Sequence, residues 1–336
     1  AAMGSAQLAA LASDQLRALE SADFAAATTA ALAAISTLAL SALTTGQLAA
    51  LGSDQWQALT NDQLRGLTTA QIASLTSDDL NALTTEQFAN LTTAQIAGLT
   101  TTQVSTMESA DLGALTDAQL AALSTRAILA LDTGDIGAMT SVQLAALTTA
   151  QIRAIETADL VKITTASLGG LSTLQISALS TQQLGALATD QLQALTTDQL
   201  AGLTTAQIAA LATDDLNMLT ASQFEALGTA QIVALSTLQF NNLDSADLVA
   251  WSTAQVRAIE TRDIAALDSA DVAALTQDQL GALTTAQLRA IETNDLAAIA
   301  ASQLAQSLTT AQIVALSSSQ LGALASDQIQ AVTPWV

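Results

Sequence analysis

The stretch from Leu67 to Ser74, LTTAQIAS, is the unit from which the chain is built. With its eight positions labelled a to h, the same register runs without a gap from Met3 to Ile299. In most copies position a is a large aliphatic residue, e is Gln or Asp, f is apolar and h is Ala or Gly, whereas d and g vary. The 336 residues are therefore predicted to form a single array of about forty octads.

Each octad predicts one very short helix. A continuous helix would rotate successive octads by about 80°, and a coiled coil needs a repeat of seven or eleven residues. A strand would place f and the next a on opposite faces. Ser or Thr at b or c can serve as the N-cap, and the sequence leaves both positions open. Where b is Thr and e is Gln, as in Thr68 and Gln71, the pair also fits a capping box.

The placement of charge supports helices that restart in every octad. All acidic residues except Glu225 lie at b to e, and most basic residues lie at g or h. Acidic residues favour a helix N-terminus and basic residues its C-terminus. The predicted fold is an all-α solenoid, a superhelix of about forty very short capped helices with f, a and the small h facing a shared interior.

The sequence gives a weaker indication of how many helices make one superhelical turn. Acidic residues at b recur every three octads at Glu108, Asp132 and Glu156, and this favours three helices per turn over two. Duplication of a longer block would give the same spacing.

Two places depart from the octad. One extra residue between Ile299 and Leu308 shifts the register, and we expect a bulge or a change of curvature there. Residues 333–336 form a non-repeat tail, in which Pro334 cannot continue a helix. The array begins in mid-octad at residues 1–3, from which we expect a segment of a longer array or a subunit that stacks end to end.

Composition argues against several classes of function. The chain has no Cys, His or Tyr, which removes the usual zinc ligands and nucleophile–His catalysis. A net charge of -22 with eight Lys and Arg argues against nucleic-acid binding. No stretch approaches the ~20 apolar residues of a membrane span. The chain is predicted not to be an enzyme, and no catalytic, cofactor-binding or metal-binding residues are predicted.

The recurrent polar residues have structural interpretations. The Gln or Asp at e is interpreted as a ladder between turns, with a binding surface as the alternative. Acidic e residues are interpreted as partners of helix N-termini, with Ca²⁺ ligation as the alternative, at Asp79, Asp111, Asp135, Asp159 and Asp215. An Arg three residues before a Glu predicts surface ion pairs in 153–156, 257–260 and 289–292. Aromatic residues at f are predicted to fill the core, namely Phe24, Trp56, Phe88, Phe224 and Phe240.

The LTTAQIAA-like unit, at residues 67–74, 203–210 and 283–290, resembles the Thr/Gln/Leu-rich octapeptide-repeat arrays of large bacterial surface and secreted proteins, including adhesin-like ones. The resemblance implies an extracellular or cell-surface location and a structural or adhesive role, and it carries over no functional residues. A secretion signal is not visible in the chain.

Three functional hypotheses follow. The first is an extracellular structural protein that forms a rod, a stalk or a self-assembling filament, associates end to end and contacts cell-surface or matrix components. The second is a lattice of Thr hydroxyls at b or c that binds ice or a polysaccharide, with members Thr68, Thr84, Thr92 and Thr100. The third is an α-solenoid scaffold that holds a protein partner.

Overall fold

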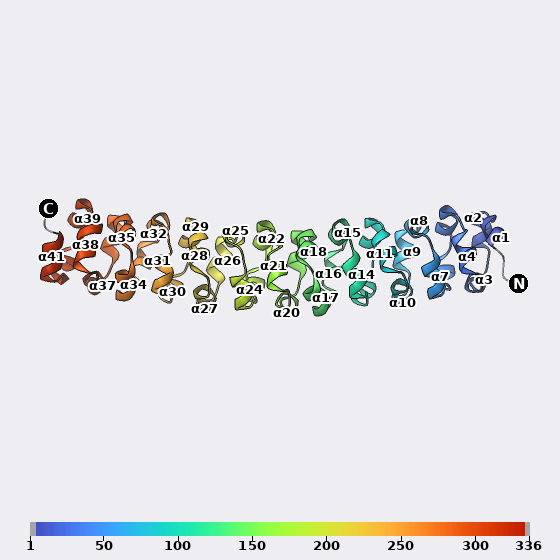
Figure 1. The fold of residues 1–336 in the computed structure, drawn as a ribbon, viewed down its shortest axis with the longest axis horizontal. Coiled ribbons are helices and arrows are strands. Elements are labelled where there is room, and N and C mark those ends of the chain that lie inside the picture. The colour runs from blue at the N-terminus through green and yellow to red at the C-terminus, as the bar shows by residue number, and fades with distance from the viewer. Residues whose placement is uncertain (1–4, 333–336) are drawn as a thin grey trace. The chain divides into compact units, whose positions relative to one another are not determined.

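The computed structural model describes residues 5–332, which form 41 α-helices and no strand (Figure 1). The prediction of an all-α solenoid of short capped helices, one per octad, is confirmed. The helices fall into two compact units, unit 1 from Ala1 to Gly170 and unit 2 from Leu171 to Val336. The octad register itself continues across the boundary between them.

Unit 1 contains the first 21 helices. Their bounds are α1 Ser5–Ala9, α2 Ser13–Arg17, α3 Ser21–Ala25, α4 Thr29–Ala33, α5 Thr37–Ser41, α6 Thr45–Leu48, α7 Ser53–Ala58, α8 Asn61–Gly66, α9 Thr69–Ala73, α10 Ser77–Asn81, α11 Thr85–Asn90, α12 Thr93–Ala97, α13 Thr101–Ser105, α14 Ser109–Ala114, α15 Asp117–Ala122, α16 Thr125–Ile128, α17 Thr133–Ala138, α18 Ser141–Ala146, α19 Thr149–Ala154, α20 Thr157–Leu160 and α21 Thr165–Leu168.

Unit 2 contains the remaining helices. Their bounds are α22 Thr173–Ala178, α23 Thr181–Leu184, α24 Thr189–Gln193, α25 Thr197–Ala201, α26 Thr205–Ala210, α27 Thr213–Asn217, α28 Ala221–Ala226, α29 Thr229–Ala234, α30 Thr237–Phe240, α31 Ser245–Val249, α32 Thr253–Ala258, α33 Thr261–Ile264, α34 Ser269–Ala274, α35 Gln277–Ala282, α36 Thr285–Ala290, α37 Thr293–Ala297, α38 Ala301–Ser307, α39 Thr310–Ala315, α40 Ser318–Ala323 and α41 Ser326–Val332.

Every helix begins just after position b, which settles the identity of the cap. In α9, the Thr68 side chain accepts a hydrogen bond from the backbone N–H of Gln71, and Thr69 at c is already the first helical residue. The helix ends where the next a and b residues become extended, as at Leu67 with φ −66° and ψ 141° and at Thr68 with φ −71° and ψ 156°. No residue from 5 to 332 has a positive φ, so these connections need no glycine.

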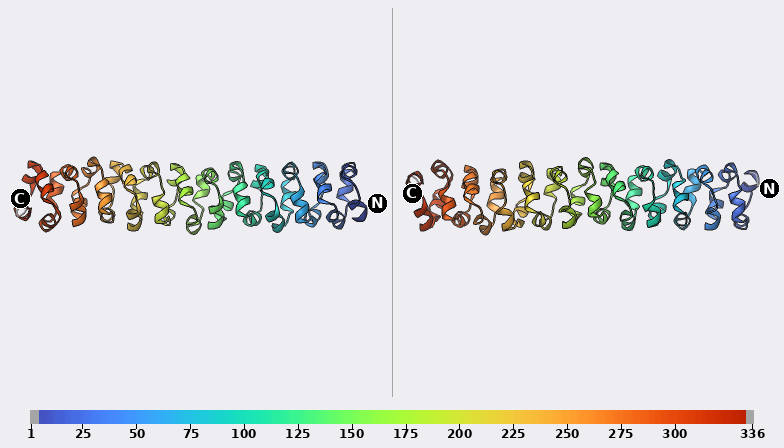
Figure 2. Two further views of the ribbon diagram at one scale, coloured as in Figure 1. Left: turned by 90° about the horizontal axis from the view of Figure 1, so that it is seen from above. Right: turned by 90° about the horizontal axis from the view of Figure 1, so that it is seen from below.

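Within each unit, a helix packs on the helix three places along the chain. In unit 1, α5 packs on α8, α8 on α11 and α11 on α14. In unit 2, α26 packs on α29, α29 on α32 and α32 on α35. Both views in Figure 2 show this regular succession of short helices. Three helices, or 24 residues, therefore make one turn, as the recurrence of acidic residues at b favoured.

The core consists of the residues at f and a. The f side chains are the more deeply buried, and the aromatic residues predicted to fill the core do so, with Trp56 and Phe88 at 0% exposure. Position h is small because it faces the c residue of the preceding turn. A Cβ atom on Gly66 would lie 2.1 Å from Thr37 Cγ2, and one on Gly202 would lie 2.9 Å from Thr173 Cβ.

The extra residue of the 299–308 segment is accommodated inside a helix. α38 has seven residues, and the backbone N–H of Leu308 bonds to the Leu304 carbonyl four residues back. In other octads, as at Leu67 and Leu64, the residue at a bonds three residues back. The array then resumes, so the expected bulge is a lengthened helix. The predicted tail at 333–336 and the start of the array at 1–3 lie outside the described residues.

The helices of the described chain are at most seven residues long. None of those between residues 5 and 332 has the length and apolar character needed to cross a lipid bilayer.

Candidate functional site: the rungs between turns

The Gln residue at position e connects helices that lie about thirty residues apart in sequence. In α9, Gln71 Oε1 accepts a bond from the backbone N of Thr68 at 2.8 Å and from its hydroxyl at 3.0 Å. Gln71 Nε2 donates to the carbonyl oxygens of Ser41 at 3.1 Å and Leu43 at 2.8 Å. The side chain is 5% exposed. We call this arrangement a Gln rung.

A Gln rung caps two helices with one amide. Its oxygen completes the capping box at the N-terminus of its own helix, and its nitrogen satisfies carbonyls at the C-terminus of the helix four places earlier. The same geometry recurs at Gln95, which bonds the carbonyls of Leu64 and Leu67, and at Gln287, which bonds those of Val256 and Ile259. Only a side chain with an acceptor, a donor and this reach can do both, which explains Gln at e.

Asp at e forms a different rung, because a carboxylate is shorter and donates no hydrogen bond at neutral pH. Asp135 Oδ1 instead accepts a bond at 2.8 Å from the hydroxyl of Ser109, which is position c of the helix three places earlier. Asp263, with 0% exposure, likewise accepts a bond at 2.7 Å from Thr237. The same relation joins Asp159 to Thr133 at 2.6 Å, Asp271 to Ser245 at 2.9 Å and Asp295 to Ser269 at 2.5 Å.

The acidic b residues all occur in octads with Asp at e. Each of the eight octads with Asp or Glu at b also has Asp at e. These octads carry the pairs Glu20 and Asp23, Glu108 and Asp111, Asp132 and Asp135, Glu156 and Asp159, Asp244 and Asp247, Glu260 and Asp263, Asp268 and Asp271, and Glu292 and Asp295. This link between b and e is present in the sequence, but the sequence-based interpretation treated the two positions separately.

Six of these pairs stack in two columns. The acid column of unit 1 lies on α14, α17 and α20, which pack on one another in that order, and the acid column of unit 2 lies on α31, α34 and α37. Burial raises the pKa of Asp111, a bond from Thr85 lowers it, and the charge of Glu108 raises it again. Burial also raises the pKa of Asp271, against the opposing effect of bonds from Ser245 and the Asp268 backbone.

The pKa of Asp247 is raised furthest, to about 6, first by burial and then by the charge of Asp244. Its Oδ2 atom is buried and has no hydrogen-bond partner. Asp247 is therefore the Asp rung in the acid columns whose carboxylate is least satisfied.

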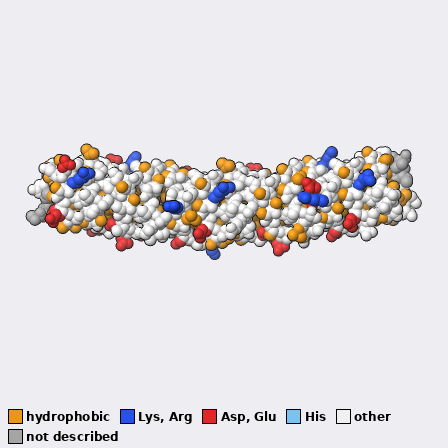
Figure 3. All heavy atoms as spheres, turned by 180° about the vertical axis from the view of Figure 1, so that it is seen from behind, with side chains coloured by type: hydrophobic (Ala, Val, Ile, Leu, Met, Phe, Trp, Pro, Cys, Tyr) orange, Lys and Arg blue, Asp and Glu red, His pale blue; other side chains and the backbone are white. Residues whose placement is uncertain are grey.

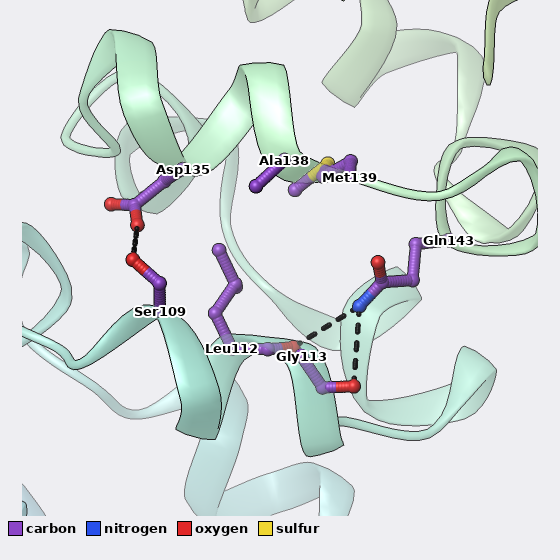
Figure 4. A pocket seen from close by; sticks show the side chains of 7 residues that line it. All are labelled: Ser109, Leu112, Gly113, Asp135, Ala138, Met139 and Gln143. Atoms are coloured by element: carbon purple, nitrogen blue, oxygen red, sulfur yellow. Dashed lines mark hydrogen bonds between the residues drawn. The ribbon is translucent and has the colours of Figure 1, made fainter. Parts of the chain in front are cut away.

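A small cavity lies where an Asp rung meets a Gln rung in unit 1 (Figure 4). Its volume is about 20 Å³, roughly that needed for one water molecule. The bond from Ser109 to Asp135 borders it on one side, and on the other Gln143 Nε2 reaches the Leu112 and Gly113 carbonyls at 3.3 and 3.4 Å. The two bonds of Gln143 are longer than those of Gln95, which measure 2.7 and 2.8 Å.

Long polar side chains at g form further links, in the opposite direction. Arg17 Nε donates to the carbonyl of Ala42 at 2.8 Å, and Asn81 Nδ2 donates to that of Thr106 at 2.7 Å. Each joins a helix end to position h of the next turn, 25 residues later. These contacts are exposed, so they add less to stability than the buried Gln rungs.

The alternatives for the acidic residues and ion pairs can now be compared with the structure. The five Asp residues considered for Ca²⁺ all lie at position e, and residues 5–332 contain no group of three acidic or metal-ligating side chains that could hold an ion. In the predicted pair of 257–260, Glu260 binds Arg262 instead, at 2.9 Å. That guanidinium also lies 3.4 Å from Asp263 Oδ2.

The hydroxyls at b are committed to local bonds. Thr68 Oγ1 accepts from the N–H of Gln71 and donates to its Oε1, and Thr92 and Thr100 make the same pair of bonds with Gln95 and Gln103. Thr84 also accepts from the N–H of Gln87. These four hydroxyls at b therefore serve in helix capping, and the Thr lattice at b or c stays a prediction.

The described surface carries scattered side chains of each kind. The face in Figure 3 shows basic, acidic and apolar side chains scattered among backbone atoms and side chains of other types. Large exposed apolar residues occur at intervals, for example Leu38 at 77% and Val142 at 63% exposure in unit 1. Single exposed apolar residues are ordinary on protein surfaces and do not define a docking groove.

The repeated short helices, their three-per-turn stacking and the rungs between turns define an α-solenoid repeat protein. The family model described as the ALTTAQ repeat matches overlapping segments that together run from residue 16 to 290. The chain belongs to the ALTTAQ repeat family. No curated protein matches it.

Proposed function

We propose that the chain is a structural repeat protein of the bacterial cell exterior, without catalytic activity, which forms a stalk or the subunit of a self-assembling filament. The Gln rung carries this proposal. It recurs from Gln47 in unit 1 to Gln328 in unit 2, with Nε2 bonded to carbonyls of an earlier turn at both places. A polar side chain used in this way holds successive turns together and is suited to a load-carrying or spacing role.

The direction of the rungs supports head-to-tail association between copies. Each turn presents amide donors toward the preceding turn and carbonyl acceptors toward the following one. Two copies that joined by the same chemistry would make a heterologous contact, which produces open filaments. The net charge of -22 opposes close approach, so association should strengthen as salt screens the repulsion.

Electron microscopy and sedimentation velocity test this proposal on the purified full chain. We expect elongated particles, and a sedimentation coefficient that rises with protein concentration, more steeply at high salt. Compact particles that stay monomeric at every concentration and salt would contradict both the stalk and the filament.

The extracellular location is supported by the resemblance to surface and secreted octapeptide arrays. Cell-surface or matrix components are the corresponding partners. Exposure of intact source cells to a protease and an antibody against the chain tests the location. We expect the protease to remove the antibody signal from intact cells. A signal that survives until the cells are lysed would contradict an exterior location.

A further inference from the structure

The octad 243–250 in unit 2 lacks both of the arrangements that stabilise position e. Asp247 lies in α31, where a Gln would bond the carbonyls at the end of α27, and a carboxylate cannot donate those bonds. The hydroxyl that serves other Asp rungs comes from position c of the helix three places earlier. For Asp247 that position is Ala221, the first residue of α28, which packs on α31.

The remaining local bonds are also missing. The N-cap residue Asp244 makes no side-chain cap bond, and α31 has no capping box, whereas Asp268 and Asp271 form one in α34. Asp247 Oδ2 is consequently buried without a partner. Leaving such an acceptor without a hydrogen bond destabilises the docked helix.

The charges near Asp247 oppose its ionisation. On its own octad it faces Asp244, whose charge adds to the effect of burial. The helices packed on α31 carry other acidic residues, Glu225 on α28, Asp268 at the N-cap of α34 and Asp271 on α34, but Asp244 is the charge that acts on Asp247. Of the two helices that flank α31 in sequence, α30 has no charged residue and α32 has Arg257 in its last turn.

A second unsatisfied group lies directly after this octad. Trp251 follows α31 at position a, and its ring packs on Phe224 and Phe240 with centroid distances of 6.3 and 5.8 Å. Its Nε1 atom is buried with no hydrogen-bond partner. An unpaired acceptor and an unpaired donor thus lie four residues apart, and both would gain by contact with water.

We propose that the octad 243–250 is a proton-operated joint, in which α31 is docked while Asp247 is protonated and loosens when Asp247 ionises. A protonated carboxyl group can donate as well as accept, and it loses less hydration on burial than a carboxylate. The pKa of Asp247 is about 6 in the folded chain, against 3.8 for an ordinary aspartate side chain. A folded pKa above the unfolded value gives stabilisation that is complete below about pH 4 and is lost as the pH rises through about 6.

Amide hydrogen exchange of the full chain tests the joint. The informative amides are those of Ala250 and Trp251, which bond the carbonyls of Asp247 and Leu248. After correction for intrinsic exchange, we expect their protection factors to be about tenfold higher at pH 5 than at pH 7.5. The amides of Ala266 and Leu267 at the end of α33 are the internal control, because Asp263 is bonded to Thr237. They should change less than about twofold over the same range.

Two variants separate the joint from a general effect of acid. Ala221→Ser supplies the missing hydroxyl and should raise protection at pH 7.5 toward the value at pH 5. Asp247→Asn, which mimics the protonated acid, should make protection independent of pH. The proposal is overturned by equal protection at both pH values in the unmodified chain. It is also overturned if either variant retains the full pH dependence.

Discussion

The two acid columns have the same pattern of acidic residues at b and Asp at e, and they differ in whether a hydroxyl faces the first Asp. Each has three Asp rungs on stacked helices, with an acidic residue at b beside every one. The first rung of unit 1, Asp111, receives a bond from Thr85, whereas the first rung of unit 2, Asp247, faces Ala221. A buried carboxylate in this solenoid therefore depends on position c of the helix three places earlier.

The largest effect is expected from removing a Gln rung near the unit 1 column. Gln95→Leu leaves the carbonyls of Leu64 and Leu67 without their donor and should lower the free energy of unfolding by about 3 kcal/mol. Urea unfolding measures it. Gln57→Leu is the control, because Gln57 is exposed at g, and it should change stability by less than about 0.5 kcal/mol. Equal losses in the two variants would show that the rungs are not what joins the turns.

Thr85→Val should make the unit 1 column resemble that of unit 2. The Asp111 carboxylate loses its hydroxyl donor, so we expect a loss of about 2 kcal/mol at pH 7 and a higher pKa for Asp111. Unfolding and carboxyl chemical shifts measure the two changes. Thr93→Val controls for the loss of a hydroxyl at c, because the residue 26 positions later is Gln119. If both Thr variants behave alike, the difference between the columns does not arise from this bond.

Asp247→Gln should convert the weakest Asp rung into a Gln rung. The new amide can reach the carbonyls of Leu216 and Leu219, which have the sequence spacing found in other Gln rungs, and we expect a gain of about 1.5 kcal/mol at pH 7. Asp135→Gln should gain less, because Asp135 already has a bond from Ser109. Thermal unfolding of both variants measures the difference. A larger gain in stability at Asp135 would show that Asp135, and not Asp247, is the less well stabilised of the two carboxylates.

The smallest effect is expected at position b. Glu108→Thr removes an exposed like charge three residues before Asp111 and should stabilise unit 1 by about 0.3 kcal/mol while lowering the pKa of Asp111. The gain should shrink at high salt, because salt screens the repulsion. A gain that is independent of salt would point to better capping by Thr, and not to relief of charge.

The features that could be predicted from the sequence are those that depend on residues of the same octad. The capping box of Thr68 and Gln71, the burial of f and a, and the small h follow from spacings inside one octad. The second half of the Gln rung could not be predicted in detail, because Gln71 Nε2 bonds residues 28 and 30 positions earlier, and that distance depends on the number of helices per turn. The importance of Ala221 is hidden for the same reason, since only the superhelix brings it to Asp247.

The partners in exposed ion pairs were the least predictable feature of the structure. Glu260 was expected to pair with Arg257, three residues before it, but it binds Arg262. Exposed ion pairs have small energies, so local sequence spacing does not determine which partner is chosen.

The extended a and b residues between helices also bear on how such an array can change its length. No described connection needs an unusual backbone angle, and a rung needs only free carbonyls four helices back. If unequal recombination removed or added a whole octad, each Gln side chain after that point would still find carbonyls four helices back. Smaller insertions must be absorbed within one helix, as α38 does with its additional residue. Length in multiples of eight can thus vary between generations while the fold stays intact.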